Sequence, residues 1–245
     1  MKNFKKVLAL VLTVAMVLSS MTFAFAQTVV QNQEKAEVLF DLGLFKGANP
    51  DKFEPRLEND MNRAEAVTMV IRLLGWDADA TAEIPFKDKE LSGDYAWAKP
   101  FIAKAYEEGI TVGNSATEFG VVEKVTLQQY ATFLLRALGY DINGENYAQA
   151  PEMAYEAGLL SLADVLAADK AAIRDQLVGV SYNALFASEK DSDVTLLEKL
   201  IADEKVTEDQ VIKSGDADLI ALLEEVTTGE DLEVVSVVAD NLKEV

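Results

Sequence analysis

One arginine in this sequence has the neighbours needed to bind an anionic ligand. Arg63 follows Asn62, a residue type that favours the N-cap of a helix, and Glu65 completes a capping-box pattern. Apolar residues follow at helical spacing, so we expect Arg63 at the first position of a helix. There, free backbone N–H groups and the helix dipole favour an anion, and a guanidinium can bind a carboxylate through two parallel hydrogen bonds. The alternatives are a solvated Arg63 and a Glu65 that serves only the cap.

A similar stretch recurs 64 residues later and identifies a repeat. Residues 126–141 match residues 62–77 in their cap, apolar spacing and closing glycine. Leu127 and Gln129 stand in this copy where the first has arginine and glutamate, so an ionic contact to a carboxylate is expected to be lost there. Restoring both by Leu127→Arg with Gln129→Glu is expected to add a binding site.

A third, weaker copy keeps the arginine but not the cap. It reads Ile173-Arg174-Asp175-Gln176, and the side chain of Ile173 cannot accept a hydrogen bond. Asp169 is the better helix start by sequence, which would put Arg174 in the second turn. We therefore expect one well-formed site near Arg63 and a second, less complete one near Arg174.

Each copy is predicted to fold as helix, loop, helix, so the fold class is mainly α. Glycines that can end a helix follow the first amphipathic run of each copy, at Gly43, Gly109 and Gly158. In the first two copies a second glycine follows four residues later, at Gly47 and Gly113. These pairs predict the same tight loop in both copies.

Together these motifs resemble the S-layer homology domain. The resemblance covers residues 34–187, as three units, and rests on four elements: the Asn62-Arg63-Ala64-Glu65 motif, Phe86-Lys87-Asp88, Trp97-Ala98 and the Gly109–Gly113 loop. It implies that three units pack about a pseudo-threefold axis. It also implies that grooves between them bind secondary cell-wall polysaccharide, often bearing ketal-linked pyruvate, with the motif arginine recognising the anionic sugar.

The resemblance and the motifs together define a set of expected polysaccharide-binding residues. Trp97 could instead be a core residue, and stacking against a sugar ring is the functional alternative. Arg72 and Arg136, in the last turns of their helices, are expected to serve the helix dipole and surface solubility. The expected binding residues are Arg63, Asn62, Glu65, Trp97, Arg174, Gln176, Gly47 and Gly113.

The chain divides by sequence into a leader, three repeats and an acidic tail. Residues 1–26 have the basic start, short apolar run and Ala-Phe-Ala end of a signal peptide, so no membrane insertion is expected after cleavage. The repeats are expected at 27–83, 84–143 and 144–187. The tail, 188–245, is predicted to hold helices at Val194–Ala202 and after Thr207, with a short strand at Glu233–Val238.

Composition excludes several kinds of chemistry. The 245 residues include no Cys and no His, so there is no disulfide, no usual zinc site and no Ser/His or Cys/His nucleophile. We expect no catalytic residues, no metal and no cofactor. The net charge of −20 makes nucleic acid and anionic membranes unfavourable partners. An anionic wall polymer remains possible, because salt screens charges beyond about 8 Å and a local arginine-lined groove can still attract it.

These features favour a binding module over an enzyme. The leading interpretation is an exported protein held noncovalently at the cell wall or S-layer by polysaccharide binding. The alternative is a structural subunit of a surface layer or envelope assembly that self-associates or contacts other envelope proteins. A wall-active hydrolase is a third class, disfavoured because the 58-residue tail is too short for a usual catalytic domain.

Overall fold

The computed structural model describes residues 30–47, 52–79 and 81–224. The chain divides into two compact units, Met1–Gln31 and Asn32–Val245, and the features below belong to the second. The expected signal peptide and the expected strand at Glu233–Val238 lie outside the described residues. Within the described ranges, no helix is both long and apolar enough to cross a membrane.

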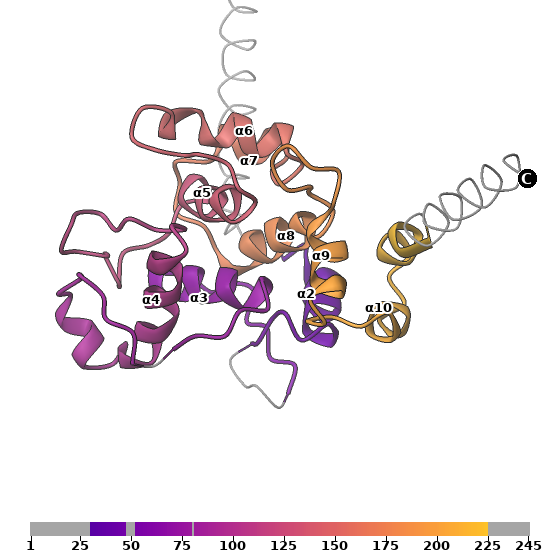
Figure 1. Ribbon diagram of the computed structural model, residues 1–245, viewed down its shortest axis with the longest axis horizontal. Coiled ribbons are helices and arrows are strands. Elements are labelled where there is room, and N and C mark those ends of the chain that lie inside the picture. Colours follow the sequence, from indigo (N-terminus) through magenta and orange to yellow (C-terminus); the bar gives the residue numbers. More distant parts are fainter. Residues whose placement is uncertain (1–29, 48–51, 80, 225–245) are drawn as a thin grey trace, which may run out of the picture. The chain divides into compact units, whose positions relative to one another are not determined.

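The described chain is mainly helical, as the sequence predicts (Figure 1). Over these residues β-structure is limited to isolated bridges. Three short 3-10 helices, η1 (Lys89–Ser92), η2 (Ala96–Ala98) and η3 (Tyr147–Gln149), precede α-helices. The α-helices include α2 (Gln33–Asp41), α3 (Arg63–Leu73), α4 (Lys99–Glu107), α5 (Leu127–Ala137), α6 (Ala150–Glu156), α7 (Leu162–Leu166), α8 (Arg174–Ala184), α9 (Leu196–Ala202) and α10 (Glu208–Ser214), and residues 217–224 are also helical.

Helix ends follow the local sequence in the first two copies. Helices α3 and α5 begin with complete capping boxes at Asn62 and Thr126, which confirms both predicted starts. Gly43, Gly109 and Gly158 follow α2, α4 and α6 at φ values of +77°, +71° and +76°. Such angles are costly for residues with a Cβ, so the glycines are required where the chain turns.

The start of α8 corrects a prediction. The helix begins at Arg174, so Asp169 is not its N-terminus and Arg174 occupies the first position, as Arg63 does in α3. Ile173 forms a bridge with Asp60, and the Arg174 N–H donates to Asn59 O at 2.9 Å. These contacts hold the chain extended up to Ile173, which the capping preference of Asp169 alone could not show.

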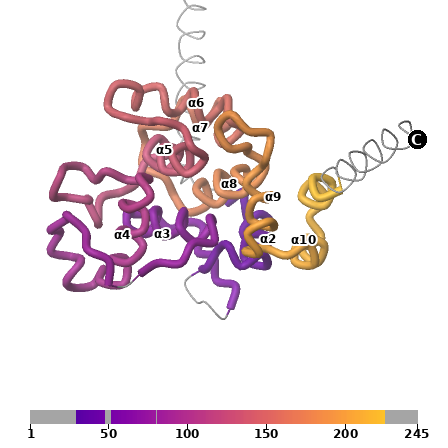
Figure 2. Tube along the Cα trace, in the orientation of Figure 1, coloured from indigo at the N-terminus to yellow at the C-terminus, as the bar shows by residue number. Residues whose placement is uncertain are grey.

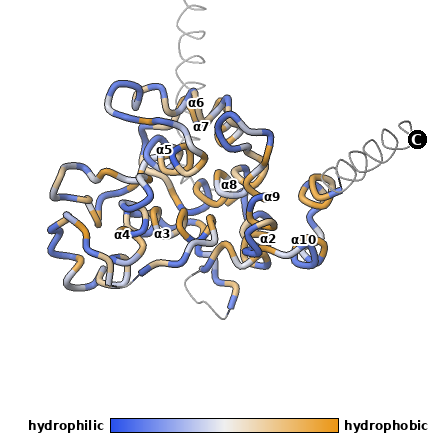
Figure 3. Tube along the Cα trace, viewed as in Figure 1, coloured by the Kyte–Doolittle hydropathy of each residue, from blue (hydrophilic) through white to orange (hydrophobic). Residues whose placement is uncertain are grey.

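Each motif helix packs against the first helix of the following copy. Helix α4 packs on α3, α6 on α5, and α2 on α8, while α3, α5 and α8 contact one another (Figure 2). Hydrophobic residues recur along the helices between hydrophilic ones (Figure 3). The predicted inward faces of two motif helices are confirmed as buried: Val67, Val70 and Ile71 in α3 with its C-cap Leu74, and Ala131, Leu134 and Leu135 in α5 with its C-cap Leu138.

A closed ring of three backbone hydrogen bonds joins the segments before these helices. The Met61 N–H donates to Ala172 O at 3.3 Å, the Ala172 N–H to Val125 O at 2.8 Å, and the Val125 N–H to Met61 O at 3.0 Å. All three residues are buried. Because buried amides must be paired, the ring fixes the three segments in mutual register.

The tail helices extend this arrangement. Helix α9 follows the cap Thr195, and the N–H groups of Leu196 and Leu197 donate to Ala187 O and Leu185 O, next to the end of α8. Helix α10 starts after Thr207, as predicted, and Gln210 Nε2 donates to Leu42 O at 3.4 Å. Both predicted tail helices are confirmed, and α10 contacts α2.

The ring makes a specific stability prediction. Ala172→Pro removes the N–H that donates to Val125 O and leaves a buried carbonyl without its donor, so the free energy of unfolding should fall by about 1–3 kcal/mol. Ala171→Pro is the matched control, because the Ala171 N–H donates to no group in the described part of the chain. Urea unfolding measures both; equal losses for the two variants would contradict a role for the ring.

Candidate anion-binding grooves

Arg63, the first residue of α3, lines a cavity whose other lining residues come from further along the chain. This cavity is here called the Arg63 groove. The cavity has a volume of about 430 Å³. Among the described residues, none that lines it is Asp or Glu. Its lining includes Arg63, the Thr111–Asn114 loop, Gln129, Thr132, Phe133, Arg136 and Tyr147.

The arginine of α8 opens into an equivalent cavity, here called the Arg174 groove, with a volume of about 400 Å³. In each groove, the arginine at the first position of one motif helix shares the cavity with three residues of another motif helix. These three are the third, sixth and tenth residues after the N-cap of that second helix. The Arg174 groove is lined by Arg174, Glu65, Thr68 and Arg72, with Gly47, Lys46, Arg56 and Trp97 among the others.

In this arrangement, the two charged residues of the first motif lie in different grooves. Arg63 lines the Arg63 groove, whereas Glu65 lines the Arg174 groove. The residue that accompanies Arg63 is Gln129 of the second copy. Arg63 and Glu65 therefore line different grooves, because the ring of backbone bonds turns each motif helix toward two different neighbours.

Arg63 is buried at 4% exposure, so the solvated-surface alternative is wrong. Its Nε donates to Phe119 O at 3.0 Å, and its Cζ lies 4.9 Å from the Phe119 ring centroid and 5.5 Å from that of Phe133. Burial lowers the pKa of Arg63, and nearby carboxylates of Glu123 and Asp88 oppose that shift. No carboxylate of the described residues lies within ion-pair distance of its guanidinium.

The backbone amides at this helix start are already used. The Arg63 N–H donates to Glu123 O at 2.9 Å and the Ala64 N–H to Val121 O at 3.3 Å, while the Glu65 N–H donates to Asn62 Oδ1. The expectation of free N–H groups for a ligand is therefore wrong. Of the groups at this helix start, the guanidinium of Arg63 is the one that lines the groove.

Asp88 holds the loop on which Arg63 rests. Its carboxylate accepts hydrogen bonds from the N–H groups of Phe119, Gly120 and Val121 at 2.9, 2.8 and 3.2 Å. Burial alone would raise the pKa of Asp88, but these three donors outweigh it and lower the pKa. The same loop presents Phe119 O to Arg63, so Asp88 positions the arginine through the backbone.

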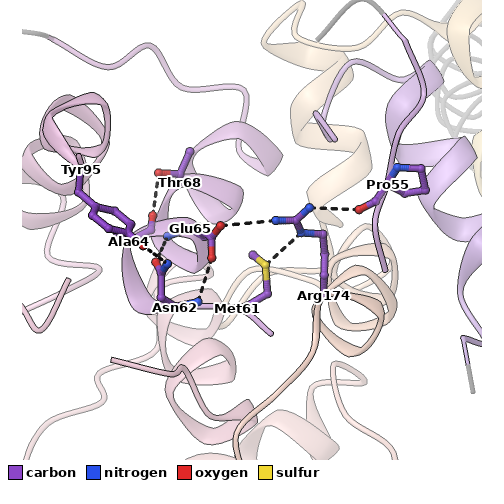
Figure 4. Close-up of polar contacts among 8 residues, drawn as sticks. All are labelled: Pro55, Met61, Asn62, Ala64, Glu65, Thr68, Tyr95 and Arg174. Atoms are coloured by element: carbon purple, nitrogen blue, oxygen red, sulfur yellow. Dashed lines mark hydrogen bonds and ion pairs between the residues drawn. The ribbon is translucent and has the colours of Figure 1, made fainter. Parts of the chain in front are cut away.

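Arg174 is held differently, by an internal ion pair (Figure 4). Its Nη2 lies 3.6 Å from Glu65 Oε1, its Nη1 donates to Pro55 O at 3.2 Å, and its Nε lies 3.1 Å from Met61 Sδ. Burial lowers the pKa of Arg174, and the charge of Glu65 acts against that shift. In this groove the chain already supplies a carboxylate to the motif arginine.

Two of the expected binding residues are occupied by helix capping. Asn62 Oδ1 accepts from the Glu65 N–H, and its Nδ2 donates to the Tyr95 hydroxyl at 3.0 Å (Figure 4). Gln176 Oε1 accepts from the Ile173 N–H at 3.1 Å. Glu65 combines both roles, since its Oε2 accepts from the Asn62 N–H at 3.1 Å while its Oε1 faces Arg174.

The remaining expected residues line the two grooves. Gly113 has φ +75°, and a Cβ there would lie 2.4 Å from Phe86 Cε1; a Cβ on Gly47 would lie 2.2 Å from Glu54 O. Both loops therefore need glycine to lie as close as they do. Trp97 is 45% exposed and lines the Arg174 groove, so it is not a core residue.

Sequence reasoning missed Arg72 and Arg136 as groove residues. Arg136 Nε and Nη2 both donate to Ile142 O, its Nη1 donates to Ile110 O, and it lines the Arg63 groove. Arg72 lies in the Arg174 groove with its Cζ 5.1 Å from the Phe101 ring centroid. Their shared position in two copies was the available signal.

At the third equivalent place, the two residues that correspond to the groove arginines, Leu127 and Asn183, are uncharged. Leu127 stands at the first position of α5 and is 1% exposed. Asn183, which corresponds to Arg72 and Arg136, donates to Leu159 O and accepts from Lys35 Nζ. The two motif arginines thus belong to two of the three equivalent positions.

The Asp88 clamp predicts a pH-dependent contribution to stability. Asp88→Asn should lower the free energy of unfolding at pH 7 by about 1–2 kcal/mol, since a partly exposed charge is weakened by solvent. A lowered folded-state pKa stabilises above the unfolded value of about 3.9 and loses that effect as pH falls through the folded value. The difference from wild type should therefore shrink below about pH 4. Exposed Asp94→Asn is the control; a difference that persists unchanged at lower pH would contradict the clamp.

Comparison with known proteins identifies one domain. Residues 85–131 match the S-layer homology domain, a segment that contains Asp88, α4 and the Gly109–Gly113 loop. Similar proteins include a "Cell surface protein" of Thermoanaerobacter kivui, 31% identical over 57% of this chain and 19% of that protein. An "Endoglucanase" of Bacillus sp. (strain KSM-635) is 30% identical over 31% of this chain and 9% of its own. A "Surface-layer 125 kDa protein" of Lysinibacillus sphaericus is 32% identical over 46% and 9%.

This chain spans less than a fifth of the length of these curated relatives. The matches support a location at the cell surface, in agreement with the expectation from sequence. They also confirm the resemblance drawn from the sequence motifs. Residues 85–131 of this chain are thus similar to the S-layer homology domain.

Proposed function

We propose that this protein attaches noncovalently to the cell surface by binding an anionic cell-wall polysaccharide in the Arg63 and Arg174 grooves. The observation that carries the proposal is the charge of the Arg63 groove. It presents two arginines and, within the described residues, no acidic lining residue, in a chain of net charge −20. A guanidinium in such a setting favours a carboxylate or another planar anion.

The size and lining of the grooves fit sugar binding. Their volumes of about 430 and 400 Å³ fall within the range of small-ligand pockets. Each combines cations with an aromatic side chain, Tyr147 in one and the exposed Trp97 in the other. Two grooves on one chain could engage one polymer together, and linked weak contacts gain about 10²–10⁴ in avidity.

We further propose that three repeats, 27–83, 84–143 and 144–187, surround a pseudo-threefold axis, followed by an acidic extension at 188–245. The cyclic exchange of backbone hydrogen bonds among Met61, Val125 and Ala172 supports this arrangement. So do the bridges Asn62–Lys124, Thr126–Ala171 and Ile173–Asp60, which pair each residue before a motif helix with the same offset in another copy. In this proposal the grooves arise where neighbouring repeats meet.

A structural subunit of a surface layer is the second candidate. It is favoured by the name of the Lysinibacillus sphaericus relative, a surface-layer protein. Both candidates are non-catalytic and give the protein a role at the cell surface. They differ in whether the grooves hold polysaccharide or only pack repeats together.

Co-sedimentation with purified sacculi tests the proposal. Arg63→Met keeps an apolar stem in the buried position but removes the charge-assisted contact, worth about 1.5–3 kcal/mol, so affinity should fall about tenfold or more. Arg63→Lys should also weaken binding, because a point charge cannot reproduce the planar fork. Sacculi stripped of polysaccharide should retain little wild-type protein.

Lys124→Met is the matched control, since it removes one exposed cation that lines neither groove. Thermal melting of each variant separates lost binding from lost folding, which matters because Arg63 is buried. Equal binding by Arg63→Met, Arg63→Lys and wild type, or full retention by stripped sacculi, would favour the structural-subunit candidate.

A further inference from the structure

We propose that the third residue of each motif helix sets whether the neighbouring groove accepts an anion. Glu65 neutralises Arg174 and weakens the Arg174 groove, whereas Gln129 leaves Arg63 available. This inference rests on the proposed function and specifies its site. The Arg63 groove is then the main binding site for a carboxylate-bearing sugar.

The Arg174 groove carries its own counter-ion. Glu65 and Arg174 lie 3.6 Å apart with side chains 30% and 13% exposed, so the pair is largely shielded from water (Figure 4). The Asn62 N–H holds the other carboxylate oxygen of Glu65. Because the cap fixes the carboxylate, an incoming anion must compete with it for Arg174 and is repelled by it.

The Arg63 groove has a neutral group at the same place. Gln129 Oε1 accepts from the Thr126 N–H at 3.1 Å, the same capping contact that Glu65 makes to Asn62. Arg63 and Arg136 therefore share the cavity without a carboxylate among its described lining residues. Glu123 and Asp88 act on Arg63 from outside the lining. An anionic ligand would add a counter-charge inside the cavity and relieve the repulsion between the two guanidinium groups.

The Arg174 groove can still attract an anion, because it contains other cations. Arg72 and Lys46 also line it, while Arg56 is paired with Glu54 at 3.4 Å. The consequence is an order of affinities, with the Arg63 groove the stronger. Removing the charge of Glu65 should raise the affinity of the weaker groove.

The capping boxes of this chain support exchanging Glu65 and Gln129 for one another as a test. Glutamate caps in this way at Glu65 and Glu198, and glutamine does so at Gln129, Gln176 and Gln210. Gln129→Glu and Glu65→Gln thus exchange two side chains that both complete capping boxes here. Gln176→Glu is the matched control, because it adds the same charge at the third position of α8 without lining either groove.

The test is calorimetric titration of the full chain with a methyl hexoside bearing a ketal-linked pyruvate, and with its methyl ester. Wild type should bind the acid and not the ester. Gln129→Glu should lower the affinity for the acid at least about tenfold. Glu65→Gln should add a second measurable binding site or raise the affinity of the weaker groove severalfold. Gln176→Glu should bind as wild type does.

Several outcomes would overturn this inference. They are equal affinity of Gln129→Glu and wild type, no gain in Glu65→Gln, or no binding of the acid by wild type. Sacculus co-sedimentation of the same variants separates it from the proposed function. If Gln129→Glu binds sacculi as tightly as wild type does, only this inference is contradicted. If the variants show the predicted pattern with the saccharide but no protein binds sacculi, only the proposed function is contradicted.

Discussion

Three backbone hydrogen bonds, exchanged in a closed ring by Met61, Val125 and Ala172, are the constraint on which the grooves depend. Each of these buried residues gives its N–H to one neighbour and its carbonyl to the other. None can leave without unpairing two buried groups. The ring therefore decides where each motif helix begins, even where the local sequence offers no capping side chain, as at Ile173.

The ring also decides which groups of each motif helix reach the grooves. Neighbouring extended segments consume the first amides of α3, so its N-terminus is closed to a ligand and only the Arg63 side chain reaches the groove. The third residue of the same helix faces a different cavity. The capping residue Glu65 thereby becomes a counter-ion for Arg174 of another copy, and one helix-start motif lines two grooves.

Local chemistry explains what the sequence could predict. Capping boxes at Asn62 and Thr126, and glycines such as Gly109, act within a few residues, so the helix ends they set could be predicted from the sequence. The start of α8 could not be predicted in this way, because the extended segment before it is held by the pairing of Ile173 with Asp60, more than a hundred residues earlier. The groove partners of Arg63 were also hidden, since Gln129 and Arg136 reach it only through the register of the ring. Arg136 looked like a dipole residue because its carbonyl partners, Ile110 and Ile142, lie in loops.

Native-state hydrogen exchange of the amides of Met61, Val125 and Ala172 tests this account most directly. If the ring organises the structure, all three should exchange only through global unfolding, with the same free energy of opening as core amides of α5 such as Leu134. Exchange of any of the three at a markedly lower free energy than those core amides would mean that the ring opens while the helices stay folded. The grooves would then be held together by helix packing instead.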